Sequence, residues 1–325
     1  MNRIALVIWT TAALIAGATS APAAPFNPNE IATDSAMLLH VDCDAIRASA
    51  IGQWLLSEPA VQDKLATLGA PYDVDLPKQL HGVTFYTTAA HSRDGVMVID
   101  ADFDPDHLLA KAQALNDILA DTNGSRVIYS WVDEKWKRRL GKSARLYGAI
   151  SGHHLLYGQS EPRIADAMDV LEGTKPSADA GKNPLYTKPG QRILLEAMID
   201  KVDFPHAQGP AAIIKMCKSI YLKVSEADNT TTATLHLETA DADTATQLNT
   251  LFQGFVGMLK MRATDTNAAQ FANSIKITQD PLALGVTTSI PSSDLIEMIK
   301  SGQQKAAQKK STHRAPAKDS QPNNN

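Results

Sequence analysis

The chain has 325 residues, of which 44% are hydrophobic and 20% charged, with two cysteines and a formal net charge of −4. This composition can build a sizeable core, and it excludes a wholly disordered or collagen-like chain. Two cysteines far apart in the sequence exclude both a disulfide framework and a zinc site made of paired cysteines.

The N-terminus predicts a signal peptide over residues 1–23. Arg3 precedes an apolar run, Ile4 to Ala18, and Ala21-Pro22-Ala23 offers a small-residue cleavage site. The run is shorter than the roughly 20 residues that a transmembrane helix needs. We therefore expect an exported protein, periplasmic or secreted, whose mature chain has no transmembrane span.

Charge is uneven along the chain. Taking the four net positive charges of residues 301–325 and Arg3 away from −4 leaves −9 for residues 24–300. An acidic body repels phosphate backbones, so no nucleic-acid partner is expected. The basic tail is poor in apolar residues and is predicted to be disordered.

One pattern recurs in chain order: an apolar strand, an Asp or Ser, and an amphipathic helix. The five predicted strands are 36–41, 96–101, 155–157, 233–237 and 282–290, and the five helices carry Ile46 to Trp54, Leu108 to Leu119, Ile164 to Leu171, Leu248 to Leu259, and Leu295 to Ile299. Asp and Ser side chains accept hydrogen bonds from the unpaired N–H groups at a helix start. The predicted caps are Asp42 or Asp44, Asp104 or Asp106, Ser160, Asp241 or Asp243, and Ser292 or Ser293. The helical apolar spacing gives each helix one face that a sheet can cover.

Between these units, paired strands predict hairpins: 82–88 with 96–101, 126–132 with 144–150, and 220–224 with 233–237 around Asp228-Asn229. Antiparallel hairpins alternating with helices indicate an α+β protein. We expect two halves, residues 24–172 and 191–300, each a mainly antiparallel sheet with amphipathic helices on one face. Glycines and prolines predict a linker or long loop over 173–190, and one continuous fold with an internal loop is the alternative.

Motifs for chemistry are sparse. The chain has no HExxH, CxxC, GxSxG or SxxK motif, so the sequence leans against an enzyme, and no cofactor is expected. His40, Asp42 and Asp44 are weak metal-ligand candidates, because they recur at every second residue of a strand end. Helix capping also explains these aspartates. His153 and His154 are expected to be solvated loop residues beside the Ser151-Gly152 turn.

A basic segment is the most distinctive local feature. Six cationic groups lie within residues 135–145 without an acidic one, and aromatic residues flank them. The candidate binding residues are Trp136, Lys137, Arg138, Arg139, Lys142 and Arg145. Cations beside aromatic rings can hold an anionic polymer or a lipid headgroup. A solvated hairpin tip is the plainer interpretation.

Cys43 and Cys217 leave two interpretations open. In an oxidising compartment they could form a disulfide between the two halves. Each could equally be a small buried apolar residue.

Three segments carry a resemblance: Asp102 to Leu115, Leu155 to Gly173, and Glu238 to Lys260. Their layout, within residues 34–300, resembles that of exported bacterial proteins of unknown function. The resemblance implies a two-part α+β fold and no functional residues. The leading hypothesis is a non-catalytic envelope protein that contacts an anionic surface or a protein partner through the basic hairpin. The alternatives are a hydrolase with a dispersed active site and a carrier of an apolar ligand.

Overall fold

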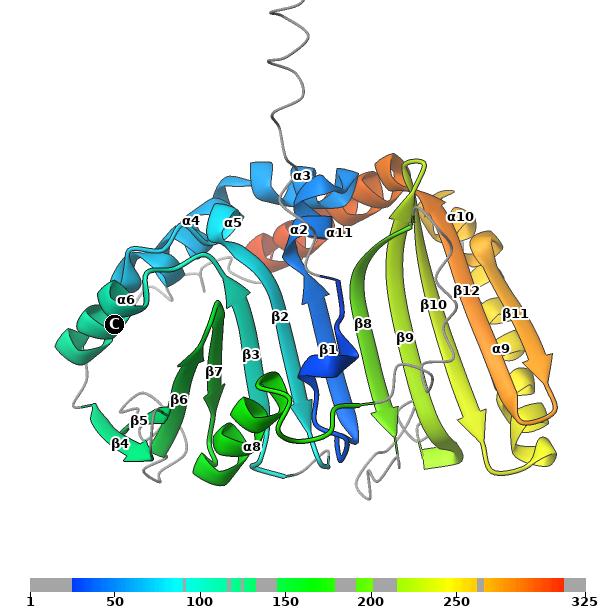
Figure 1. Ribbon diagram of the computed structural model, residues 1–325. Coiled ribbons are helices and arrows are strands. Elements are labelled where there is room, and N and C mark those ends of the chain that lie inside the picture. Colours follow the sequence, from blue (N-terminus) through cyan, green and yellow to red (C-terminus); the bar gives the residue numbers. More distant parts are fainter. Residues whose placement is uncertain are drawn as a thin grey trace, which may run out of the picture.

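The structure is a computed structural model (Figure 1) that describes residues 25–89, 92–115, 118–123, 126–132, 145–178, 191–200, 215–261 and 266–312. The predicted signal peptide and residues 313–325 lie outside these ranges.

The described strands form one twelve-stranded antiparallel sheet in the order β11-β12-β10-β9-β8-β1-β2-β3-β7-β6-β5-β4 (Figure 1). The strands are β1 (Met37–Asp42), β2 (Leu80–Thr87), β3 (Val96–Ala101), β4 (Leu119–Asn123), β5 (Arg126–Val132), β6 (Arg145–Ser151), β7 (His154–Gly158), β8 (Arg192–Asp200), β9 (Cys217–Ala227), β10 (Thr230–Thr239), β11 (Ile275–Asp280) and β12 (Ala283–Pro291).

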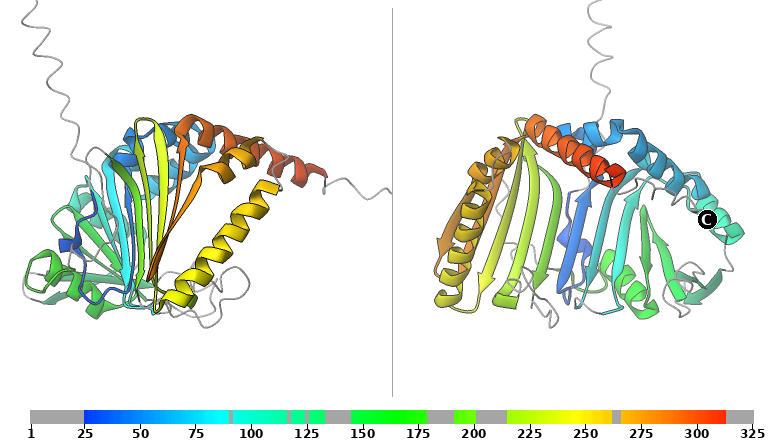
Figure 2. Two further views of the ribbon diagram at one scale, coloured as in Figure 1. Left: turned by 90° about the vertical axis from the view of Figure 1, so that its right-hand side faces the viewer. Right: turned by 180° about the vertical axis from the view of Figure 1, so that it is seen from behind.

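Helices cover one end and parts of both faces of this sheet. The described helices are η1 (Pro28–Glu30), α2 (Cys43–Ala48), α3 (Ala50–Ser57), α4 (Pro59–Gly69), η2 (Ala70–Tyr72), α5 (Leu76–Gln79), α6 (Pro105–Leu115), α8 (Glu161–Leu171), α9 (Ala242–Met261), α10 (Thr266–Ser274) and α11 (Ser292–Thr312). The helices α8 and α9 lie on opposite faces (Figure 2).

The fold is α+β, as the sequence predicted. The strand β1 pairs with β2 on one side and with β8 on the other, so strands from both predicted halves share a single sheet. Residues 179–190, most of the predicted linker, lie outside the described part. The division into halves at residues 24–172 and 191–300 stays a prediction.

The recurring strand-and-helix unit is present in all five places. Three of the predicted aspartate caps are confirmed: Oδ1 of Asp42 accepts from Ala45 N, that of Asp104 from His107 N, and that of Asp241 from Thr244 N. Each bond satisfies an N–H group that the helix itself cannot pair.

The predicted serine caps are not confirmed. Ser160 makes no capping bond with its side chain. The hydroxyl of Ser292 instead donates to the buried carboxylate of Glu226. The second predicted helix is also too long, because Leu119 begins strand β4. Apolar spacing alone does not tell where a helix gives way to a strand.

Strand register places a continuous apolar row on one face of the sheet. Because directly paired residues share a face, the row can be followed across eleven strands. It runs Tyr129, Gly148, Tyr157, Met97, Phe85, Leu39, Ala197, Leu222, Leu235, Val286 and Ile277. We call this the apolar face. Helix α9 covers its β11 end, where Phe252 joins a core with Leu235 and Val286.

The opposite face changes character along the sheet. Around β3, β6 and β7 it is apolar and forms the larger core with α8, through buried residues such as Val98, Leu156 and Ile164. Towards β9 the same face carries Glu196 and Lys223, which are buried and paired across the strands. Helix α8 therefore covers the part of this face that is apolar.

Helix α11 extends into the segment predicted to be disordered. It runs to Thr312, and residues 301–312 are mostly Gln, Lys and Ala, which are good helix formers. The first part of the predicted tail is therefore helical.

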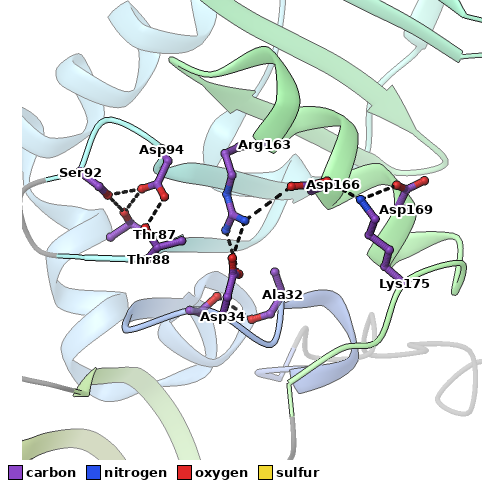
Figure 3. Close-up of polar contacts among 11 residues, drawn as sticks. Ala32, Asp34, Thr87, Thr88, Ser92, Asp94, Arg163, Asp166, Asp169 and Lys175 are labelled. Atoms are coloured by element: carbon purple, nitrogen blue, oxygen red, sulfur yellow. Dashed lines mark hydrogen bonds and ion pairs between the residues drawn. The ribbon is translucent and has the colours of Figure 1, made fainter.

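Ion pairs fasten α8 to the segment before β1 (Figure 3). Arg163 donates to both carboxylate oxygens of Asp34 at 2.9 and 3.1 Å, and it also faces Asp166 at 3.7 Å. Lys175 bridges Asp166 and Asp169. Most of these groups are partly exposed, so each pair adds little, and together they fix the position of α8.

Asp94 organises the connection between β2 and β3 (Figure 3). Its carboxylate accepts hydrogen bonds from the hydroxyls of Thr87, Thr88 and Ser92. Burial alone would raise the pKa of Asp94, but these bonds outweigh burial and hold the pKa at about 2. The ionised form is therefore favoured by the folded state.

We expect acid to remove this contribution. The folded pKa lies below the unfolded value of 3.8, so the stabilisation is complete above pH 4 and is lost as the pH falls to about 2. The free energy of unfolding should fall over this range by roughly 1–2 kcal/mol more in the wild type than in Asp94→Asn. Urea titrations at each pH measure this difference. Asp121→Asn, at an exposed carboxylate of β4, should keep the wild-type acid dependence; identical slopes in all three proteins would contradict the assignment.

Candidate functional site

An apolar cavity of about 210 Å³ lies between helix α6 and the β5-β6-β7 end of the apolar face. It is lined by Tyr72, Leu108, Leu109, Ala112, Ile118, Tyr129, Trp131, Gly148, Ala149, Ile150, Leu155, Leu156 and Tyr157. None of these described lining residues is charged. Because the lining offers a few tyrosine hydroxyls and otherwise hydrocarbon, the cavity suits an apolar group.

The floor of the cavity depends on a glycine. A Cβ at Gly148 would lie 3.3 Å from the indole of Trp131, so glycine leaves room for that ring on the strand surface. The ring centroids of Trp131 and Tyr157 are 5.9 Å apart and tilted, a favourable aromatic arrangement. Gly148 thus leaves space on β6 for the aromatic rings that the neighbouring strands β5 and β7 supply.

The roof is helix α6, held against η2. Asp104 caps the start of α6, and the carboxylate of Asp73, just after η2, faces His107 at 3.2 Å and Lys111 at 2.5 Å. Hydrogen bonds from Lys111 and His107 lower the pKa of Asp73. These contacts bring Tyr72 and the apolar side of α6 over the sheet.

The three weak metal-ligand candidates do not converge on a site. Nδ1 of His40 lies 2.8 Å from the Thr84 hydroxyl, and Asp42 caps α2. Asp44 belongs to α2 and contacts Arg47 and His81. Burial raises the pKa of Asp42 although the Ala45 N–H and Arg47 oppose this. Capping and ion pairing account for the positions of both aspartates.

The basic segment falls almost wholly outside the described residues. Trp136, Lys137, Arg138, Arg139 and Lys142 lie in the range 133–144, which the structure does not describe. Arg145 is exposed at the start of β6 and donates to the hydroxyl of Ser130 at 2.9 Å. Surface binding by this hairpin stays a prediction.

Cys43 and Cys217, both in the described part, are not joined by a disulfide. Cys43 follows the end of β1, near the start of β8, where Val41 pairs with Leu195. Cys217 begins β9 near the opposite end of β8, where Asp200 pairs with Ser219. Thiols at opposite ends of a strand cannot be bridged. Burial raises the pKa of each cysteine to about 11, which makes both poor nucleophiles.

The expectation that His154 is a solvated loop residue is wrong. It is a residue of strand β7, and its side chain is 11% exposed, while His153 in the preceding turn is 67% exposed. The expected solvated loop therefore describes His153 but not His154. The pairing of β7 with β3, which the local sequence does not reveal, sets the face of the sheet on which the second ring lies, and Glu30 lies beside it there.

Sequence reasoning missed the cavity itself. The alternation of Tyr129 and Trp131 on a predicted strand was a usable signal, because both side chains point to one face. The distance between that face and α6 depends on tertiary packing.

No helix in the described part of the chain is both long and apolar enough to cross a bilayer.

Comparisons with known proteins give a limited result. The chain matches no model of a protein family and no curated protein sequence. Two solved structures are similar in outline: crystal form III of TP0453, 12% identical with a TM-score of 0.45, and crystal form I, 11% identical with a TM-score of 0.43. Each covers 86% of this chain, and 99% and 98% of its own. At these values neither assigns a function to this chain.

Proposed function

We propose that this protein is an exported, non-catalytic binding protein that holds an apolar group between α6 and the β5-β6-β7 end of its sheet. The observation that carries the proposal is the cavity of about 210 Å³, whose described lining has no charged residue. A site whose polar side-chain groups are a few tyrosine hydroxyls and an indole N–H offers little for acid–base chemistry, but it can exclude water from a hydrocarbon.

The volume sets the size of the ligand. An engineered apolar cavity of about 150 Å³ binds benzene, whereas pockets for drug-sized molecules begin near 300 Å³. A cavity of about 210 Å³ therefore suits a small ring or one end of an alkyl chain. We propose that the ligand is the acyl chain of a lipid or a fatty acid, with its polar head outside the cavity.

An envelope location fits this ligand, because membranes are the main source of acyl chains. The proposal of export depends on the predicted signal peptide at residues 1–23. The basic hairpin, with Arg145 at its described end, would add contact with anionic headgroups.

The test is binding of saturated fatty acids of increasing length, measured by tryptophan fluorescence, because Trp131 lines the cavity. We expect saturable binding that strengthens with each methylene until the cavity is full, since each buried CH₂ contributes roughly 0.8 kcal/mol. Filling the cavity with Ala112→Leu should weaken binding about tenfold.

Helix α6 also provides the matched control. Ala110 lies on the exposed side of the same helix, so Ala110→Leu adds the same atoms outside the cavity and should leave the affinity unchanged. Equal affinities of the two variants, or no dependence on chain length, would refute the proposed site.

A further inference from the structure

Two adjacent histidines and a carboxylate from a distant part of the chain lie close together at one end of strands β3 and β7. Asp100 pairs with His154 across these strands, and His153 precedes His154 in the turn. One ligand atom from each of Asp100, His153 and His154 lies within 4.8 Å of the others. The Nε2 atom of His153 lies 3.7 Å from Oδ1 of Asp100.

A second carboxylate stands beside this cluster. Oε2 of Glu30 lies 3.7 Å from Nε2 of His154, and its other oxygen accepts a hydrogen bond of 2.7 Å from the Asn27 amide. The ring of His154 is also hydrogen-bonded to the backbone of Ser151. Such contacts from neighbouring groups hold metal-binding side chains in one orientation.

The cluster lies between two cavities of mixed polar and apolar lining. Asp100 and Glu30 line one of about 300 Å³, together with His40 and Thr84. His153 lines the other, a shallow one of about 560 Å³. An ion could therefore enter from solvent, and a water molecule or a small anion would have room beside it.

We propose that Asp100, His153 and His154 bind a divalent transition-metal ion of the zinc class, with Glu30 as a nearby carboxylate that offsets the charge of the ion. Imidazole nitrogens suit zinc and its neighbours, whereas calcium and magnesium prefer oxygen ligands throughout. Three protein ligands leave a coordination position open to water. This site is separate from the apolar cavity and does not depend on the proposed function.

Metal binding requires the three ligand atoms to move closer together. Ligand atoms of a tetrahedral zinc ion lie roughly 3.3 Å apart, given metal–ligand distances near 2.0 Å. The separation between His153 and Asp100 is 3.7 Å, and those to His154 are at most 4.8 Å. His153 is an exposed side chain in a turn, so a rotation of its ring can bring its nitrogen closer to the other two ligand atoms.

The test is titration of the full chain, without a polyhistidine tag, with ZnCl₂ in metal-free buffer by calorimetry. We expect His153→Ala and Asp100→Asn each to weaken zinc binding at the strongest site at least tenfold. Calcium and magnesium chloride should not compete. Cobalt bound at the same site should give visible absorption that His153→Ala abolishes.

His107 supplies the matched control. It is an exposed histidine that faces one carboxylate, Asp73, at 3.2 Å, so His107→Ala should leave zinc binding unchanged. Because His153 is exposed, its replacement should not disturb folding, and thermal unfolding of the metal-free variants checks this. Wild-type zinc affinity in both His153→Ala and Asp100→Asn would overturn the proposal, as would an equal loss in His107→Ala.

Discussion

Replacing Glu226 with alanine should cost the protein about 3 kcal/mol of unfolding free energy, one of the two largest effects that we expect. The Glu226 side chain is 1% exposed. Its two carboxylate oxygens accept from the Ala50 N–H at 2.9 and 3.1 Å, and one of them accepts from the Ser292 hydroxyl at 2.9 Å. One carboxylate thus joins the first residues of α3 and α11 to strand β9.

The expected loss has two sources. Alanine would leave the partly buried Ala50 N–H without its acceptor and the buried Ser292 hydroxyl with only the Thr231 hydroxyl as a partner, and a buried group without a partner costs roughly 1–3 kcal/mol. It would also remove a negative charge from the positive end of the α3 dipole. Scanning calorimetry should show a fall of roughly 5 °C in Tm, because an unfolding entropy of about 2.1 cal/mol/K per residue gives about 1.6 °C per kcal/mol for a folded chain of roughly 300 residues.

Two further variants separate the causes. Glu226→Gln keeps the shape and one acceptor oxygen, so it should lose about 1 kcal/mol. Glu297→Ala removes an exposed carboxylate of α11 that pairs with Lys300, and it should change stability by less than about 0.5 kcal/mol. If Glu226→Ala were no worse than Glu297→Ala, the carboxylate would not be what holds the two helices.

The second large effect concerns the two cores. Ile164 of α8 and Leu248 of α9 are both 0% exposed, on opposite faces and near opposite ends of the sheet. Truncation to alanine should cost about 3 kcal/mol at either position, through lost burial and the cavity left behind. Since β1 and β8 join the two ends in one sheet, we expect both variants to lower the same calorimetric transition.

The exposed face of α9 gives the control for this experiment. Leu251 is 47% exposed, so Leu251→Ala should shift the transition far less than Leu248→Ala. Two separate transitions, one lowered by each core variant, would show instead that the halves 24–172 and 191–300 unfold independently.

Local physical chemistry accounts for the part of the fold that the sequence could predict. Asp228 and Asn229 have φ angles of 49° and 55°, the left-handed conformation that a two-residue hairpin turn requires. The caps at Asp42, Asp104 and Asp241 likewise depend on residues within three positions. In each case the decisive contact joins residues that are close in the sequence.

Long-range register accounts for what could not be predicted. The sequence around His40 does not show that its partner on the neighbouring strand β8 is Glu196. Nor does the sequence around Asp100 show that it pairs with His154 on β7. The apolar cavity and the histidine cluster are both products of such pairings. The break between α2 and α3 is of another kind, because Ser49 ends one helix and caps the next, and the apolar spacing continues through it.

The place of β1 has a consequence for biosynthesis. Strand β1, the first of the described strands, lies near the middle of the sheet. Its pairing with β8, in which Met37 lies opposite Ile199, can form only after β8 has been synthesised. Until then one edge of β1 is open, and an open edge can pair with another chain. Such late closure favours slow folding and exposes the nascent chain to aggregation. If the whole chain crossed a membrane before it folded, β8 would already be present when β1 formed. The edge of β1 could then be paired at once, which would lower the risk of aggregation.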